Sequence, residues 1–84
     1  IYQTRIQKER FKTESDYSRY FGRYILNQKS LKLIKKNAKI MHPLPRINEI
    51  SPQVDSDQRA IYFEQAQNGV YTRMAILMFL FDID

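Results

Sequence analysis

The stretch His42-Pro43-Leu44-Pro45-Arg46 decides how this 84-residue chain can fold, because no regular element can pass through it. Each proline fixes its own φ angle and lacks a backbone donor, and each pushes the residue before it toward extended geometry. A helix or a central strand must therefore end here. The result is a stiff turn with bare carbonyls, which is either a rigid connector or a loop that binds a ligand.

The segments before the turn predict an α/β arrangement. β-branched and aromatic residues at 1–6 indicate a short strand, and residues 39–41 indicate a brief buried strand that enters the turn. Between them, residues 30–38 place Leu31, Ile34 and Ala38 on one face, which predicts a helix capped by Ser30. The order strand, helix, strand is typical of an α/β layer.

Two segments between these elements are less regular. Residues 7–17 are highly polar and predict a loop, whereas residues 20–26 are compatible with either a short strand or a helical turn.

A long helix is predicted to end the chain, at about residues 58–81, with Asp57 as its N-cap. Its apolar stripe consists of Phe63, Ala66, Val70, Met74, Leu77, Met78 and Phe81. Gly69 interrupts this helix at a cost of about 1 kcal/mol relative to alanine, which predicts a close neighbour at that point. The apolar run 75–81 is too short to cross a bilayer, which needs about 20 residues.

Composition limits the kinds of site that the chain can carry. With no cysteine and one histidine, a disulfide framework and a structural zinc site are excluded. The net charge of +5 is divided unevenly, since residues 1–46 carry +9 and residues 47–84 carry −4. Such a basic half can face nucleic acid, an acidic surface or small anions. With 84 residues the chain is at most one small domain, and because it opens at Ile1 inside a predicted strand, we expect it to be a fragment or a processed piece of a longer protein.

Arg5 and Gln7 are the first candidate binding residues. In a strand they would point to the same side, where a guanidinium beside an amide suits a carboxylate. Glu9 could hold Arg5 in position, although the spacing alone favours the simpler interpretation of a solvated, charged strand end. His42 lacks nucleophilic or acidic companions and is interpreted as structural. The lysine-rich helix has no interleaved aromatics, which argues against base recognition.

Taken together, these segments resemble the aspartate carbamoyltransferases. The matching pieces, in order, are Thr4–Arg10, Met41–Arg46, Asn48–Ile50, Val54–Asp57, Tyr62-Phe63, Gln65-Ala66, Asn68-Gly69 and Arg73–Ala75. The resemblance covers the whole chain. It implies a Rossmann-like parallel-sheet domain, of which residues 1–84 would be the C-terminal part of the aspartate-binding half, with the last helix packing toward an absent carbamoyl-phosphate domain.

The resemblance also implies roles for individual residues. Arg5 and Gln7 would bind the carboxylates of L-aspartate, and the backbone carbonyls of Pro43 and Leu44 would accept hydrogen bonds from the amino group of carbamoyl phosphate. The bond between Leu44 and Pro45 would be cis. Four supporting residues are implied by the same likeness: Glu9 to hold Arg5, Arg10 to pair across the domain cleft, Lys8 in the same loop, and Tyr17 to tie that loop to Asn48.

The activity implied is the joining of carbamoyl phosphate and L-aspartate into N-carbamoyl-L-aspartate and phosphate, in pyrimidine (UMP) biosynthesis. It needs no cofactor and no metal. The implied setting is a homotrimer in the cytoplasm or a plastid, with regulatory chains or fused pyrimidine-pathway domains as further partners and no nucleic acid or membrane. The family's Ser-Thr-Arg-Thr phosphate loop is absent from these residues, so the chain alone is expected to be inactive. The alternative is a non-catalytic structural or regulatory descendant.

Overall fold

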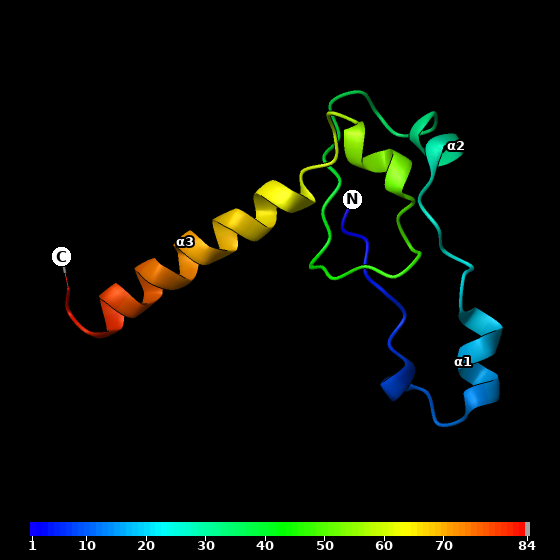
Figure 1. The fold of residues 1–84 in the computed structure, drawn as a ribbon, viewed down its shortest axis with the longest axis horizontal. Helices are drawn as coiled ribbons and strands as arrows, with labels where there is room; N and C mark the ends of the chain where they lie inside the picture. Colours follow the sequence, from blue (N-terminus) through cyan, green and yellow to red (C-terminus); the bar gives the residue numbers. More distant parts are fainter. Residues whose placement is uncertain (84) are drawn as a thin grey trace.

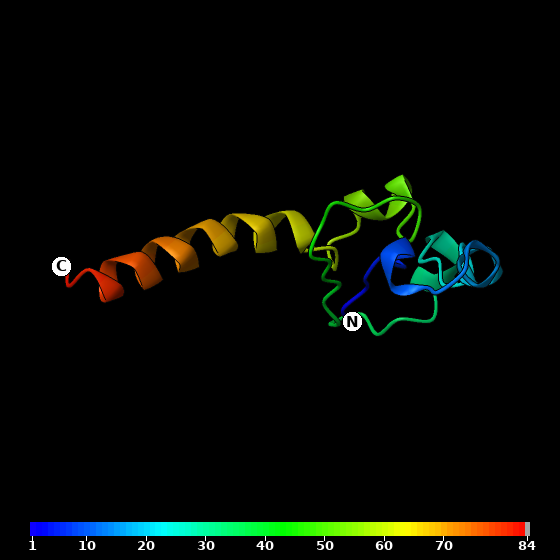
Figure 2. The same ribbon diagram turned by 90° about the horizontal axis from the view of Figure 1, so that it is seen from below.

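The computed structural model describes residues 1–83 of the chain (Figure 1). Within them, two short 3-10 helices and three α-helices follow one another: η1 (Lys8–Arg10), α1 (Glu14–Tyr20), α2 (Gln28–Leu31), η2 (Pro52–Ser56) and α3 (Tyr62–Leu80). The first four helices and the loops between them form one body, from which α3 extends away alone (Figures 1 and 2). No helix within residues 1–83 is both long and apolar enough to cross a membrane.

Parallel backbone pairings organise this body. They join Tyr2 with Met41, Ile40 with Ala60, and Leu26 with Ile50. Ile40 lies at the centre of these pairings and is fully buried. Its N–H donates to the Arg59 carbonyl (2.7 Å), and its carbonyl accepts from the N–H of Ile61 (3.0 Å). The buried segment predicted at 39–41 is therefore confirmed at Ile40. The predicted strand at 1–6 is reduced to the single paired residue Tyr2.

The structure thus confirms a mixed fold with parallel pairing and a long C-terminal helix, but it contains few paired residues within the described part of the chain. The side chain of Gln3 joins the separate pairings, because its amide donates to the carbonyls of Tyr24 (2.9 Å) and Glu49 (3.2 Å). The core that results is small and consists of Leu26, Ile40, Ile50, Val54 and Tyr62.

The loop predicted at 7–17 is wrong in its second half, where α1 begins at Glu14. Thr13 caps this helix by accepting a hydrogen bond from the N–H of Asp16 (3.1 Å). The spacing of a threonine and an acidic residue three positions later is a known helix start, so this helix was readable in the sequence.

The helix predicted at 30–38 is also shorter than expected. α2 ends at Leu31, and its cap is Asn27, whose side chain accepts from the N–H of Ser30 (3.0 Å) in a reciprocal capping box. The chain then turns because Arg59 takes the carbonyls that a longer helix would need: its Nη1 donates to those of Leu31 (3.0 Å) and Ile34 (2.7 Å).

The last helix begins four residues later than predicted, and Asp57 does not cap it. Asp57 instead binds Arg59 through both carboxylate oxygens, at 2.9 Å to Nε and 2.9 Å to Nη2. Ala60 pairs with Ile40 in extended geometry, so α3 starts only at Tyr62, after Ile61. The neighbouring element expected to approach Gly69 is not there within the described residues, where the nearest side chain to Gly69 is that of Arg73 on the same helix.

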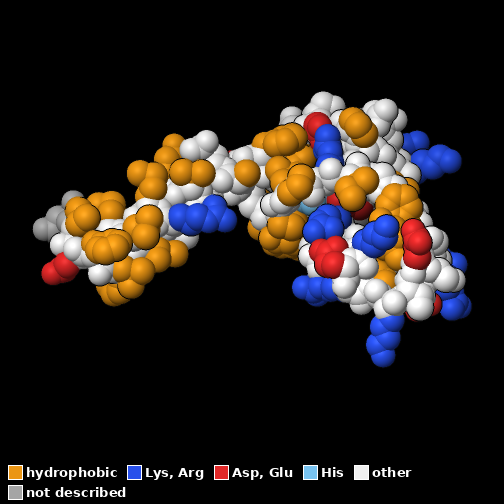
Figure 3. Space-filling model, turned by 60° about the horizontal axis from the view of Figure 1, so that its bottom comes forward, with side chains coloured by type: hydrophobic (Ala, Val, Ile, Leu, Met, Phe, Trp, Pro, Cys, Tyr) orange, Lys and Arg blue, Asp and Glu red, His pale blue; other side chains and the backbone are white. Residues whose placement is uncertain are grey.

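The chain is extended for its length. Its radius of gyration is 16.5 Å, whereas a compact chain of this length has about 12 Å. Its accessible surface is 7036 Å², against about 5,300 Å² for a compact protein of this mass. α3 accounts for much of the difference, because residues 70–83 are exposed and the helix carries apolar side chains on the face seen in Figure 3.

Candidate functional site

Arg5, Gln7 and Arg10 line one open depression. Its volume is about 430 Å³, and Thr4, Ile6 and Phe11 complete its wall. Arg5 donates to Glu9 through Nη2 (3.2 Å), so the contact predicted between these two side chains is present. The pKa of the Glu9 carboxyl is lowered, first by a backbone hydrogen bond and then by Arg5. The depression thus offers two guanidinium groups and one amide to an anion.

An aromatic cluster supports the loop that carries these residues. Tyr17 packs edge-on against Phe11 (ring centroids 5.8 Å apart) and also contacts Phe21 (5.4 Å). Lys8 lies over the Tyr17 ring (5.9 Å). Within residues 1–83, Tyr17 makes these ring contacts and no hydrogen bond with Asn48, so the tie predicted between them is not seen here.

The proline turn has the cis bond between Leu44 and Pro45 that the resemblance implies. Leu44 has a φ angle of 50°, in the left-handed region that side chains other than glycine rarely occupy. Its N–H donates to Nδ1 of His42 (2.7 Å), and the N–H of His42 donates to Oε1 of Gln65 on α3 (3.0 Å). Among the described residues, no protein donor reaches the carbonyl oxygens of Pro43 or Leu44.

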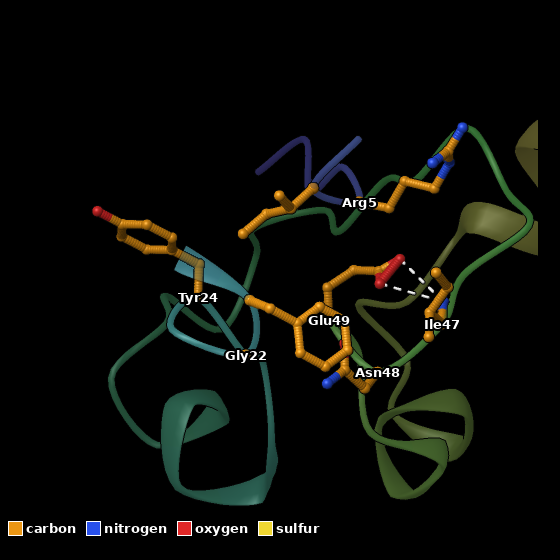
Figure 4. Close-up of a pocket in the computed structure, with 8 residues that line it drawn as sticks. Arg5, Gly22, Tyr24, Ile47, Asn48 and Glu49 are labelled. Atoms are coloured by element: carbon orange, nitrogen blue, oxygen red, sulfur yellow. Dashed lines mark hydrogen bonds between the residues drawn. The ribbon is translucent and has the colours of Figure 1, made fainter. Parts of the chain in front are cut away.

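Glu49 is the site residue that the sequence did not single out. It is 5% exposed, and Nε2 of the buried His42 lies 3.0 Å from its Oε1. The N–H of Ile47 donates to both carboxylate oxygens (3.1 Å each), as the dashed lines of Figure 4 show. Burial raises the pKa of the Glu49 carboxyl, but its own backbone N–H, the N–H of Ile47 and the His42 ring outweigh burial and lower it overall. The buried carboxylate is therefore ionised.

Glu49 also lines a tight cavity together with Arg5. This cavity has a volume of about 10 Å³, and Ile6, Ile47 and Asn48 are among its other lining residues; Figure 4 shows Arg5, Ile47, Asn48 and Glu49 around it. Pro43 and Leu44 line neither this cavity nor the depression around Arg5 and Gln7. Within the described chain, the two predicted halves of the site therefore do not share one pocket.

The other end of the turn is fixed by Arg46. Its Nη2 donates to Oδ2 of Asp55 (2.7 Å), and its Nη1 contacts Oδ1 of Asp55 and the hydroxyl of Tyr62 (3.3 Å). The Tyr62 hydroxyl in turn donates to Asp55. Hydrogen bonding from Arg46 lowers the pKa of Asp55, while burial and then Asp55 raise the pKa of Tyr62 to about 12. The turn is therefore held against η2 and the start of α3.

The described residues offer two kinds of group to a ligand. Cationic donors are available at Arg5 and Arg10, which line the open depression, and main-chain acceptors are available at Pro43 and Leu44. Among residues 1–83, no group of three or more histidine or acidic side chains is placed to hold a metal ion.

Comparison with known proteins identifies the family. The family model of the aspartate/ornithine carbamoyltransferase Asp/Orn-binding domain matches residues 1–80. The aspartate carbamoyltransferase catalytic subunit of Clostridium acetobutylicum is 58% identical over 77 residues, which are 92% of this chain and 25% of that protein. The chloroplastic aspartate carbamoyltransferase of Oryza sativa subsp. japonica is 58% identical over 81 residues, 95% of this chain and 22% of that protein.

A solved structure agrees with these relatives. Aspartate transcarbamoylase from Trypanosoma cruzi, in complex with carbamoyl phosphate and aspartate, superimposes with a TM-score of 0.81 and 41% identity, over 90% of this chain and 25% of that one. The chain thus spans about a quarter of the length of these relatives. Since the family model covers nearly all of its residues, the chain belongs to the aspartate/ornithine carbamoyltransferase family, and its relatives at high identity are aspartate carbamoyltransferases.

Proposed function

We propose that this chain supplies the aspartate-binding part of an enzyme that joins carbamoyl phosphate and L-aspartate into N-carbamoyl-L-aspartate and phosphate, a step of pyrimidine biosynthesis. Two observations together carry the proposal. The chain matches the family over residues 1–80, and Arg5 and Gln7 line the same depression. A guanidinium and an amide in one pocket suit the carboxylates of a dicarboxylic amino acid.

Carbamoyl phosphate is assigned to the turn. The carbonyls of Pro43 and Leu44 have no protein donor among the described residues, so they can accept hydrogen bonds from its amino group. The aspartate amine then attacks the carbamoyl carbon and loses a proton, a tetrahedral oxyanion forms, and the bond to phosphate breaks. The main contribution of the protein is to hold two anions together and to stabilise the developing charge. The basic half of the chain suits that task.

Five residues support these two binding groups in the proposal. Glu9 orients Arg5, with which it forms an ion pair (3.2 Å). Arg10 is exposed at the rim of the depression and is free to pair across a closing cleft, and Lys8 and Tyr17 contact each other beside it. Pro45 keeps the turn in its cis geometry.

The same proposal covers architecture and setting. The parallel pairings support a Rossmann-like sheet of which residues 1–84 are the C-terminal portion, and the exposed apolar face of α3 supports packing against a separate carbamoyl-phosphate domain. The whole enzyme would be a homotrimer, alone or with regulatory chains or fused pathway domains. A plastid is an alternative to the cytoplasm because one relative is named chloroplastic.

The second candidate is a non-catalytic descendant of this domain. A scaffold has no need for Arg5, Gln7 and the free carbonyls of the turn together, and this argues against it. A chimaera separates the two: residues 1–84 replace the matching segment of the Clostridium acetobutylicum catalytic subunit. We expect carbamoyl transfer to L-aspartate at a rate near that of the parent enzyme. A folded but inactive chimaera would favour the non-catalytic descendant, and turnover by the isolated 84-residue chain would contradict the idea of a partial site.

A further inference from the structure

His42 controls the only main-chain donor of residues 43–45. Pro43 and Pro45 have no N–H, so Leu44 carries the single backbone donor of this segment. That donor is consumed by Nδ1 of His42 at 2.7 Å. The main-chain groups that residues 43–45 present outward are therefore limited to acceptors, the carbonyls of Pro43 and Leu44, which have no protein donor among residues 1–83.

The hydrogen bond from the Leu44 N–H to His42 also fixes the direction of the Pro43 carbonyl. The carbonyl of Pro43 and the N–H of Leu44 belong to one planar peptide unit, and in a trans unit the two bonds point in opposite directions. The cis bond of this turn is the next one, between Leu44 and Pro45. Because the Leu44 N–H points at the buried ring of His42, the Pro43 carbonyl must point away from it, and Pro43 is exposed.

Two contacts fix the tautomer of the His42 ring in which Nδ1 can accept the hydrogen bond from Leu44. Nδ1 accepts from Leu44, so it carries no proton, and the ring proton lies on Nε2, which faces the ionised carboxylate of Glu49 at 3.0 Å. His42 is 1% exposed and Glu49 is 5% exposed, so water does not compete for either contact. The left-handed φ of Leu44 (50°) is disfavoured on its own and persists only where neighbouring contacts fix it.

We propose that His42, oriented by Glu49, is a positioning residue that leaves residues 43–45 with main-chain acceptors alone, and thereby selects a carbamoyl group, which has an amino donor, over an acyl group with a methyl in its place. This inference rests on the proposed function. It concerns a side chain that touches neither substrate and acts only through the peptide unit of Pro43 and Leu44.

Two variants in the chimaera separate the contacts of the ring. His42→Asn keeps an acceptor near the position of Nδ1 and loses the contact with Glu49, whereas His42→Gln keeps a donor toward Glu49 and loses the acceptor for Leu44. For each variant we would measure the KM for carbamoyl phosphate, the KM for L-aspartate, and the inhibition constant of acetyl phosphate, in which a methyl group replaces the amino group.

We expect His42→Gln to lower the preference for carbamoyl over acetyl phosphate about tenfold, the factor that corresponds to one lost hydrogen bond. His42→Asn should retain most of the preference, and the KM for L-aspartate should change little in either variant. Equal losses in both variants, or an unchanged preference in His42→Gln, would overturn the inference while leaving the proposed function intact. An inactive unsubstituted chimaera would overturn both.

A measurement on the unsubstituted chimaera covers the case in which His42→Gln does not fold. Nitrogen-15 spectra of labelled histidine, with the His42 signal assigned by its loss in His42→Asn, report which ring nitrogen is protonated. We expect a neutral ring with the proton on Nε2. A proton on Nδ1 would contradict the inference, because that nitrogen could not accept from Leu44.

Discussion

Tyr62→Phe tests the contacts that hold the Arg46 end of the turn. The Tyr62 side chain is fully buried, and its hydroxyl donates to Asp55 and accepts from Arg46. The substitution leaves the ring in the core but removes both hydrogen bonds of the hydroxyl, the one donated to Asp55 and the one accepted from Arg46. Since Asp55 keeps its two contacts with Arg46, the loss should be at the low end for such bonds, about 1–2 kcal/mol at pH 8.

The pH dependence of this loss follows from the pKa of Tyr62. Burial, and then the neighbouring Asp55, raise that pKa from 10.0 to about 12, so the fold favours the protonated phenol. The stabilisation is complete below pH 10 and is lost as the pH rises from 10 through 12. At pH 11 the unfolded chain is mostly ionised at this position and the folded chain is not, so about 1.4 kcal/mol is lost. The gap between the wild-type residue and Tyr62→Phe should therefore nearly close.

The assay is urea unfolding of the chimaera at pH 8, 9.5 and 11, with the transition midpoint as the readout. Tyr24→Phe is the matched control, because Tyr24 lies outside α3 with 71% of its surface exposed, and it should shift the midpoint little at any pH. The reasoning is refuted if the gap for Tyr62→Phe is constant or widens with pH, or if Tyr24→Phe behaves in the same way.

Three further predictions concern substrate binding, the core and α3. Arg5→Ala should raise the KM for L-aspartate roughly 10- to 150-fold, as expected for the loss of a hydrogen bond to a charged group. Glu9→Gln should change this KM less than about fivefold, because the ion pair between Arg5 and Glu9 is exposed. Equal effects of the two substitutions in steady-state kinetics of the chimaera would contradict the prediction. Ile40→Ala should lower the unfolding free energy by about 2–5 kcal/mol because Ile40 is fully buried, and a loss below 1 kcal/mol in urea unfolding would count against this core. Leu77→Asp should destabilise the chimaera in a thermal melt, because α3 is proposed to pack against the other domain there. The same substitution should leave the circular dichroism of the isolated chain unchanged, because Leu77 is 54% exposed in it. Equal effects on the chimaera and on the isolated chain would argue against docking of α3.

Local patterns in the sequence predicted the features that depend on a few neighbouring residues. Pro43 and Pro45 predicted a turn at residues 42–46, and the structure has a turn there. Ile40 lies in the buried segment that its neighbours predicted, and the apolar spacing after residue 62 predicted a long last helix. Each of these follows from backbone sterics or from hydrophobic periodicity, which act over a few residues.

Contacts between distant residues decided the rest. α2 ends early because Arg59, 28 residues further along, takes the carbonyl of Leu31, and α3 begins late because Ala60 pairs with Ile40. Asp57, a good cap by its position, instead binds Arg59 only two residues further along, and Arg59 is held there by the distant carbonyls of Leu31 and Ile34.

For the candidate site, the sequence by itself determined which groups are available: the cations of residues 1–46, the amide of Gln7, and a Pro-Leu-Pro segment at 43–45 with a single main-chain donor. Only the tertiary structure decided how they are used. It buried Glu49 against His42, and that ring against the N–H of Leu44, which leaves residues 43–45 with free acceptors alone. The partners of the Glu49 carboxylate all lie within residues 42–49, but no local pattern specifies that this segment is buried, and the carboxylate needs these partners only because burial removes its hydration.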